Sequence, residues 1–394
     1  MEKQYHLIEV KTAKDEKDFI LCPVYLYKNN NTWIRPLNED IKAVFDPKKN
    51  KLFRKGEAIR WILKDDREET VGRLAAFIDH KTAKNNEQPT GGIGFFECIN
   101  DQGAAFKLFD AGKEWLASKG MEAMDGPVNF GDRDRWWGCL ADGFEHEPNY
   151  CMPYNFQYYN DLFESYGFKN YFNQYTYYRA VKKEGLQPVI EEKAKRLFNN
   201  PDYAFRHLEK KKLEQYTEDF RTIYNKAWSR YPGVKEISKM HAKALMKSLG
   251  PILDEKIMWF AYYKNEPIAF YLMIPEINTI IKHLNGKMNL WGKMLFMFHK
   301  WKNTCDKALG LIFGVVPGHQ GKGIEGGLVM SFAEVALKKN FPYKHIELNW
   351  IGDFNPTMMK VAEQVGASIL KTHITYRYLF DREKEFKRAK KVNV

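Results

Sequence analysis

The sequence predicts an α/β (α+β) protein built from two tandem domains of similar organisation. Its 394 residues exceed what one hydrophobic core usually organises, since a domain commonly holds roughly 100–200 residues. The order strand, helix, hairpin, strand, helix, strand, helix, strand is also expected twice along the chain. We interpret this repetition as a duplication of one α/β unit, with the first domain over residues 1–182 and the second over residues 183–394. Residue identity between the halves is slight, so chance similarity in element order is the alternative.

The elements of the first half follow from hydrophobic periodicity and turn residues. An alternating run and a polar helical stretch begin it, and a charged turn at residues 65–69 separates two apolar runs that form a hairpin. One helix rests on the spacing of Phe106, Phe109 and Trp115 and ends before Gly120. The expected strands are 5–11, 58–63, 71–78, 92–99, 122–128 and 171–180, and the expected helices include 102–118 and 158–166. Residues 182–188 break the pattern, which places the domain boundary there.

The second half repeats this order and adds one insertion. A hairpin turned at Asn265 and Glu266 is followed by the insertion, residues 276–306, which has no counterpart in the first half. The expected strands are 203–208, 256–264, 267–274, 309–316, 345–350 and 367–380, and the expected helices are 214–228, 238–249, 324–339 and 355–364.

Composition narrows the class of protein. The five cysteines are scattered without CxxC spacing, which argues against a disulfide framework and a structural zinc site, and we expect no metal. No run approaches the ~20 apolar residues of a membrane span, and the start lacks the apolar core of a secretory signal, so we expect a cytoplasmic protein. The net charge of +12 predicts attraction to anionic partners, which include phosphate-rich cofactors, nucleic acid and membrane surfaces.

A glycine-rich turn joins a strand to a helix in the second half. Residues 314–317 end an apolar strand, residues 318–323 hold three glycines, and an apolar-spaced helix follows at once. Such a turn presents free backbone N–H groups at the positive end of the helix dipole, where phosphate oxygens bind. The spacing is neither GxGxxG nor GxxxxGK[ST], which argues against a dinucleotide fold and a P-loop. The alternative is an ordinary helix start after a tight turn.

This turn resembles the acyl-CoA turn of the GNAT superfamily, Gln/Arg-x-x-Gly-x-Gly/Ala, at Gln320, Lys322 and Gly323, and it departs from the family at Glu325. A carboxylate there would point away from the pyrophosphate or weaken its binding. The resemblance implies two GNAT-like domains, each a mixed, mostly antiparallel sheet flanked by helices, and acetyl-CoA or a longer acyl-CoA as co-substrate. The CoA-binding residues it implies are Val315, Val316, Gln320, Gly321, Lys322, Gly323, Ile324 and Asn355.

Downstream residues extend the resemblance. Glu347 and Asn349 lie on the next strand, two residues apart and therefore on one face, and Asn355 begins the following helix. We interpret Glu347 as the general base for an incoming amine, with an ion pair to a lysine as the alternative. Ala362 stands where many members carry a tyrosine acid, so Tyr376 or Tyr378 is expected to protonate the thiolate; a thiolate can also leave without an acid.

The first half lacks the GNAT signature. The corresponding turn carries Asp101 and a single glycine, so we expect that this domain has lost CoA binding. A loop over residues 126–138 alternates Asp and Arg beside two tryptophans and is expected to orient a polar substrate. Its candidate substrate-binding residues are Asn129, Asp132, Arg133, Arg135, Trp136 and Trp137. The alternative is an interdomain ion-pair loop capped by tryptophans.

The insertion contains an amphipathic stretch over residues 287–302. Apolar residues cover one broad helical face, and basic residues gather toward its C-terminal end. We expect this stretch to contact an anionic membrane peripherally or to form a wall of a long acyl channel. The alternative is a helix packed on its own domain.

The chain resembles a tandem-domain bacterial group described as N-acetyltransferases, some relatives of which act as ceramide synthases on long-chain amines. The resemblance implies an acyl-CoA-dependent N-acyltransferase that acts on a small-molecule or lipid amine rather than on nucleic acid. One alternative is an aminoacyl-tRNA-dependent transferase of the peptidoglycan type, against which the retained CoA turn counts. Another is a non-catalytic protein that binds CoA or a lipid surface.

Overall fold

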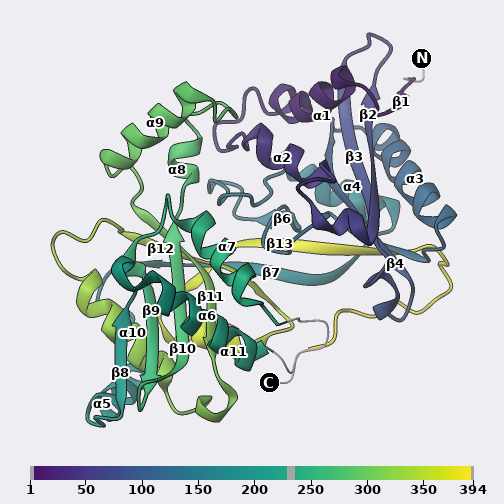
Figure 1. Ribbon diagram of the computed structural model, residues 1–394. Coiled ribbons are helices and arrows are strands. Elements are labelled where there is room, and N and C mark those ends of the chain that lie inside the picture. Colours follow the sequence, from purple (N-terminus) through teal and green to yellow (C-terminus); the bar gives the residue numbers. More distant parts are fainter. Residues whose placement is uncertain (1–3, 229–235, 392–394) are drawn as a thin grey trace.

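The strands of both halves join in one mixed sheet, as seen in the computed structural model, which describes residues 4–228 and 236–391 (Figure 1). Among these residues the sheet has 13 strands in the order β1-β2-β3-β4-β5-β13-β7-β12-β11-β10-β9-β8, with β6 paired to β13. The first-half strands are β1 (His6–Glu9), β2 (Gly56–Lys64), β3 (Thr70–Asp79), β4 (Thr90–Cys98), β5 (Ala123–Gly126), β6 (Cys139–Asp142) and β7 (Lys169–Ala180). The others are β8 (Tyr203–His207), β9 (Met258–Tyr263), β10 (Glu266–Pro275), β11 (Lys307–Val315), β12 (His345–Gly352) and β13 (Ser368–Leu379).

Helices flank this sheet, and several begin at residues that cap them. Thr12 and Asp15 form a capping box at the start of the first helix. The first-half helices are α1 (Ala13–Leu26), α2 (Asn38–Phe45), α3 (Gln102–Ser118) and α4 (Tyr158–Tyr166). The others are α5 (Pro188–Phe198), α6 (Leu213–Trp228), α7 (Lys239–Leu249), α8 (Asn278–Ile281), α9 (Leu290–Trp301), α10 (Ile324–Ala336) and α11 (Pro356–Gln364). Short 3-10 helices are η1 (Lys51–Arg54), η2 (Ala83–Asn85), η3 (Lys210–Lys212), η4 (Glu255–Ile257) and η5 (Pro317–His319).

The mixed α/β architecture agrees with the fold class expected from the sequence. Four elements besides the 3-10 helices were not anticipated: α2, the short β6, the four-residue α8, and α5, which follows the irregular stretch after β7 and begins with Pro188 at its first position. Helix α10 ends at Ala336, three residues earlier than expected. No helix in the described part of the chain is long and apolar enough to cross a membrane.

The last strand of each half pairs with the other half. β7 lies against β12, with Tyr178 opposite Glu347, and β13 lies against β5, with Tyr376 opposite Gly126. β7 and β13 also pair antiparallel with each other and run through the centre of the molecule (Figure 1). The two halves therefore share a continuous backbone hydrogen-bond ladder.

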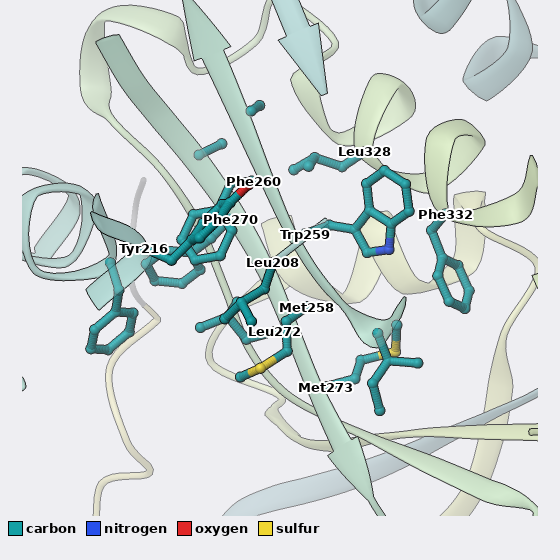
Figure 2. Close-up of a cluster of buried hydrophobic side chains, with 14 of the residues drawn as sticks. Leu208, Tyr216, Met258, Trp259, Phe260, Phe270, Leu272, Met273, Leu328 and Phe332 are labelled. Atoms are coloured by element: carbon teal, nitrogen blue, oxygen red, sulfur yellow. The ribbon is translucent and has the colours of Figure 1, made fainter. Parts of the chain in front are cut away.

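The core of the second half packs on both faces of its hairpin (Figure 2). Phe260 is fully buried and lies 5.1 Å, between ring centroids, from Tyr216 of α6. Trp259, the neighbouring residue, points to the other face, where Figure 2 shows it beside Leu328 and Phe332 of α10. Helices α6 and α10 thus cover opposite faces of the sheet. Helix α10 begins at Ile324, directly after the glycine-rich turn.

Candidate active site

The glycine-rich turn between β11 and α10 is open at the surface. Gly321 and Gly323 have φ angles of 71° and 85°, in the left-handed region that favours glycine. Apart from Gly321 and its two chain neighbours, no described residue places a heavy atom within 4 Å of the position that a Cβ would take at Gly321. A ligand can therefore approach the backbone at this point without meeting side chains.

The backbone N–H groups of this turn are available to a ligand. Gly323 is the N-cap of α10 and makes no side-chain capping bond. The amides of Gly321 and Lys322 donate to no acceptor within residues 4–228 and 236–391. The Arg196 guanidinium donates to the Lys322 carbonyl (2.8 Å), and Gln320 Nε2 of the side chain donates to the Val315 carbonyl (3.2 Å), so side chains hold the turn and leave these backbone amides unused. Free donors at the positive end of a helix form an anion site.

Glu325, the departure from the GNAT pattern, is neutralised within the fold. Its carboxylate lies 2.6 Å from the ammonium group of Lys193 on α5, and its side chain is only 14% exposed. Helix α5 packs closely on α10, since a Cβ at Gly326 would lie 2.9 Å from the Ile190 carbonyl oxygen. The negative charge of Glu325 is therefore compensated by Lys193 of α5.

A cavity opens where β11 and β12 separate. The two strands run parallel and pair only from Lys307–His345 to Gly310–Leu348. Beyond this point a cavity of about 350 Å³ lies between the strands and helices α10 and α11. Its lining is mainly apolar and includes Ile312, Val329, Phe332, Ala333, Met358 and Ala362. Asn355 also lines it and caps α11 by accepting from the Met358 amide (3.2 Å).

One polar side chain stands where the strands begin to separate. Tyr271 of β10 lines the cavity, and its hydroxyl lies 3.4 Å from the position of a Cβ at Gly310. Burial raises the pKa of Tyr271, and the nearby Arg179 opposes this only in part. Tyr271 therefore stays protonated at neutral pH. Tyr271 was not among the site residues predicted from the sequence, although its position opposite Trp259 places it on the α10 face.

Glu347 belongs to a buried group that we call the polar centre: Glu276, Lys307, Glu347, Lys371 and Asn149. Glu347 is 1% exposed, and its Oε1 contacts the Lys307 ammonium. Its Oε2 lies 2.9 Å from Lys371 Nζ and accepts from Asn149 Nδ2 (2.8 Å). Burial opposes ionisation, but the two lysines outweigh it and lower the pKa of Glu347.

Glu276 is the second carboxylate of the polar centre and the first residue of the insertion. Burial, assisted by the charge of Glu347, raises its pKa to about 7. Its Oε1 accepts from the backbone amides of Tyr150 and Asn278, both at 2.9 Å. Its Oε2 has no hydrogen-bond partner in the described part of the chain. This group can gain or lose a proton near neutral pH.

The cavity and the polar centre lie on opposite faces of the sheet. Ile346 lines the cavity, and the adjacent Glu347 does not, because neighbouring residues of a strand alternate in direction. Asn349 connects the two regions: it lines the cavity, and its Oδ1 accepts from Thr176 Oγ1 (3.0 Å). Thr176 is in turn the register partner of Lys371.

The structure does not bring Tyr376 to this site. Tyr376 is fully buried in the first half, where it stacks on Phe163 and its hydroxyl donates to Asn160 (3.0 Å) and Glu164 (3.1 Å). Tyr378 packs in the same core. Tyr376 lies five residues beyond Lys371 on β13, or about 16 Å along an extended strand. Both tyrosines lie outside the cavity and the polar centre.

The loop at residues 126–138 reaches both parts of the site. The Arg133 carbonyl accepts from Trp350 Nε1 (2.9 Å), and Trp350 lines the cavity. Arg135 lies over the ring of Tyr150, whose amide binds Glu276.

Side chains of the loop otherwise contact their own half. Trp136 is buried against Phe95, Arg133 covers Trp137, and Asn129 donates to the Asp132 carbonyl (3.4 Å). None of Asp132, Arg133 and Arg135 forms an ion pair with another residue of the described ranges. Among these residues, the side chains of the loop therefore make hydrogen bonds and ring contacts instead of ion pairs.

The corresponding turn of the first half is closed. The Asp101 carboxylate accepts from the Ala104 amide (3.0 Å) and so caps α3 itself. The Val128 carbonyl lies 1.8 Å from the position of a Cβ at Gly94, and the Val128 amide donates to Ile93. The chain itself therefore fills the space beside β4.

Solved structures share this arrangement. A tandem GNAT protein from the clavulanic acid biosynthesis pathway aligns with 97% of this chain and 100% of its own, at a TM-score of 0.54 and 8% identity. The chain has a tandem GNAT fold. A GCN5-related glucosamine N-acetyltransferase region of a fungal multi-domain GH3 β-N-acetylglucosaminidase aligns with 96% of this chain at a TM-score of 0.55 and 11% identity. This chain spans 38% of that enzyme's length.

Sequence comparison finds relatives over nearly the whole chain. A bacterial ceramide synthase of Caulobacter vibrioides is 26% identical over 377 residues, which are 94% of this chain and 96% of that protein. Protein YghO of Escherichia coli is 24% identical, with 92% of each chain covered. No family model matches the sequence.

Proposed function

We propose that this protein transfers an acyl group from acyl-CoA to an amine. The observation that carries the proposal is an open turn with free amides between β11 and α10, the two elements whose residues Phe313 and Glu325 line an apolar cavity of about 350 Å³. A phosphate-rich head at the turn and an apolar tail in the cavity would each find a complementary surface. The similarity to a protein named bacterial ceramide synthase favours a lipid amine as the acceptor.

The residues of the turn and the cavity fit the two ends of acyl-CoA. The amides from Gly321 to Ile324, with the charge of Lys322, would hold the pyrophosphate, and Val315 and Val316 lead from it toward the cavity. Asn355 and the apolar faces of α10 and α11 would hold the pantetheine arm and the acyl chain. The donor supplies a thioester, whose carbonyl carbon accepts the amine.

Tyr271 lines the cavity and is placed to move a proton in this reaction. The amine nitrogen bonds to the carbonyl carbon as the carbon–sulfur bond breaks, so one proton leaves the nitrogen and the sulfur gains one. Of the two carboxylates on the opposite face of the sheet, Glu276, with a pKa of about 7, is better matched to accept a proton than Glu347, which the lysines keep ionised. Tyr271 would protonate the sulfur from within the cavity. It would replace the tyrosine that many GNAT proteins carry at the position of Ala362.

A matched pair of glycine substitutions tests the turn. Gly321 and Gly120 both have left-handed backbones, with φ of 71° and 77°, and open space where a side chain would grow. Gly321→Leu and Gly120→Leu therefore impose similar backbone strain, but only Gly321→Leu blocks the turn. We expect CoA affinity to fall roughly 10- to 100-fold in Gly321→Leu, since one or more charge-assisted bonds to phosphate are lost, and to be unchanged in Gly120→Leu. Equal affinities by calorimetry would refute the site.

Acyl transfer itself is tested by thiol release. The intact chain is incubated with acyl-CoAs of rising chain length and a long-chain amine, and free CoA thiol and the amide product are measured together. Amide formation that requires the amine supports the proposal. Binding of acyl-CoA without any amide product contradicts it.

A further inference from the structure

Helix α9 exposes a large apolar stripe on its outer side. Six of the 13 large hydrophobic residues exposed in the described part of the chain lie on this single helix. They are Leu290, Trp291, Met294, Met297, Phe298 and Trp301, and each is between 46% and 77% exposed. At a rotation of about 100° per residue these six fall within an arc of about 120°. They form one continuous face, which we call the outer stripe.

The outer stripe is not the face that holds α9 to the protein. Leu295 and Phe296 point inward and pack on a separate cluster that contains Ile34, Leu37 and Ile281. Asn289 caps the helix by accepting from the Gly292 amide (2.9 Å). In Figure 1, α8 and α9 project from the sheet on the same side as α2. The helix is thus fixed by its inner face. Its outer face is also apolar, and no described residue covers it.

The ionised side chains of the helix and of the residues that flank it in sequence are all basic. Residues 277–305 contain five lysines and no Asp or Glu. Only Lys282 of these lysines forms an ion pair in the described part of the chain, with Glu147. By the same rotation, Lys293 and Lys302 flank the stripe on its two sides. Free positive charge therefore borders the apolar surface along its length.

We propose that α9 docks this protein on an anionic lipid bilayer, with the outer stripe in the interfacial region and the lysines among the headgroups. Helices that lie in a membrane surface combine an apolar face with flanking lysines. Tryptophans favour the membrane–water boundary because the indole is apolar with one polar N–H. Trp291 and Trp301 stand near opposite ends of the helix.

The charge also argues against a second copy of this chain as the occupant. A two-fold dimer through the outer stripe would place the same patch of both chains together. Each patch would bring five lysines and no carboxylate from residues 277–305, and like charges oppose such an interface. An anionic bilayer instead complements both the apolar stripe and its basic border.

Vesicle binding by the full chain tests this surface and requires no acyl transfer, so its outcome is independent of the proposed function. The chain is mixed with vesicles of phosphatidylcholine plus phosphatidylglycerol, or of phosphatidylcholine alone, and recovered by flotation. Binding is expected to the first mixture, weaker to the second, and reduced by salt. Absence of binding to the anionic vesicles overturns the proposal.

Substitutions in α9 test whether this helix is responsible for binding to the vesicles. Trp291→Ser with Trp301→Ser is expected to abolish flotation, since an indole that buries about 100 Å² contributes roughly 50-fold to partitioning. Lys293→Gln with Lys302→Gln is expected to weaken it roughly 30-fold, at about fivefold per lysine. The control, Met240→Ser with Leu245→Ser, removes two exposed apolar residues from α7 and should bind as the parent does.

Two results would overturn the assignment even if the parent chain floats. One is unchanged flotation of the double tryptophan variant. The other is a dimer in light scattering that the same variant dissociates, which would make a second copy the occupant. Because all substituted side chains are exposed, unaltered thermal unfolding should accompany each variant, and this separates loss of docking from loss of folding.

Discussion

The substitution Glu347→Gln distinguishes a structural carboxylate from a catalytic one. In the structure, Glu347 is the anion between Lys307 and Lys371, and Lys371 is 2% exposed. The amide of glutamine keeps the shape of the side chain but removes the charge. Two lysines then face each other beside a single remaining carboxyl group, Glu276.

The expected loss of stability follows from breaking a buried ion pair, which typically costs about 3–5 kcal/mol. Two responses limit it. Burial already lowers the pKa of Lys371, so this lysine can release its proton in the variant. Loss of the Glu347 charge also lowers the pKa of Glu276 from about 7, and its carboxylate then replaces part of the missing charge. The loss of stability should therefore be about 5 kcal/mol at about pH 6 and about 3 kcal/mol at about pH 8.

Urea denaturation followed by tryptophan fluorescence measures this difference at both pH values. The double variant Glu347→Gln with Lys371→Met should recover part of the loss, because it removes the uncompensated ammonium together with the carboxylate. Glu334→Gln, an exposed residue of α10, is the control and should stay within about 0.5 kcal/mol of the parent. If Glu347→Gln kept parental stability and lost only acyl transfer, the carboxylate would be a base and this reasoning would be refuted.

Three further predictions concern the cavity and the second carboxylate. The raised pKa of Glu276, about 7 against 4.5, gives a contribution of about 3 kcal/mol that is full below about pH 4.5 and lost as the pH rises through 7. Glu276→Gln should therefore flatten the fall of urea-unfolding stability across this window, and an unchanged slope would show that the carboxyl is not the source. Tyr271→Phe should lower kcat for thiol release about 100-fold with CoA affinity retained, if its hydroxyl is the acid; an unaltered kcat would exclude that role. Ala333→Phe should fill part of the cavity and shift the preferred acyl-CoA to shorter chains, whereas an identical chain-length profile would place the acyl chain elsewhere.

Local features were predictable from the sequence because their causes are local. Helix α3 occupies the expected residues 102–118, and α10 begins at the expected Ile324. The open turn at Gly321 depends on neighbouring glycines, and the closed turn of the first half depends on Asp101, which caps the helix that follows it. In each case the deciding side chains lie within a few residues of one another.

Features that depend on distant partners were not predictable. Glu325 is compensated by Lys193, which lies 132 residues away in the sequence. Tyr376 of the final strand was expected to protonate the thiolate, but β13 crosses to β5 and carries Tyr376 into the first half's core. Tyr271 reaches the cavity only because β10 lies beside β11 at Gly310. Strand exchange and cross-strand proximity leave no pattern in a single sequence.

The first half is part of the candidate site even though its own turn is closed. Asn149 donates to Glu347, the Glu147 carbonyl accepts from Lys371, and the Tyr150 amide binds Glu276. β7 separates β12 from β13, so the register that places Glu347 is set by a first-half strand. The closed turn of this half leaves the polar centre intact, whereas removal of its strand or of residues 147–150 would remove partners from both carboxylates. One half thus carries the open turn, and the other completes the opposite wall of the site.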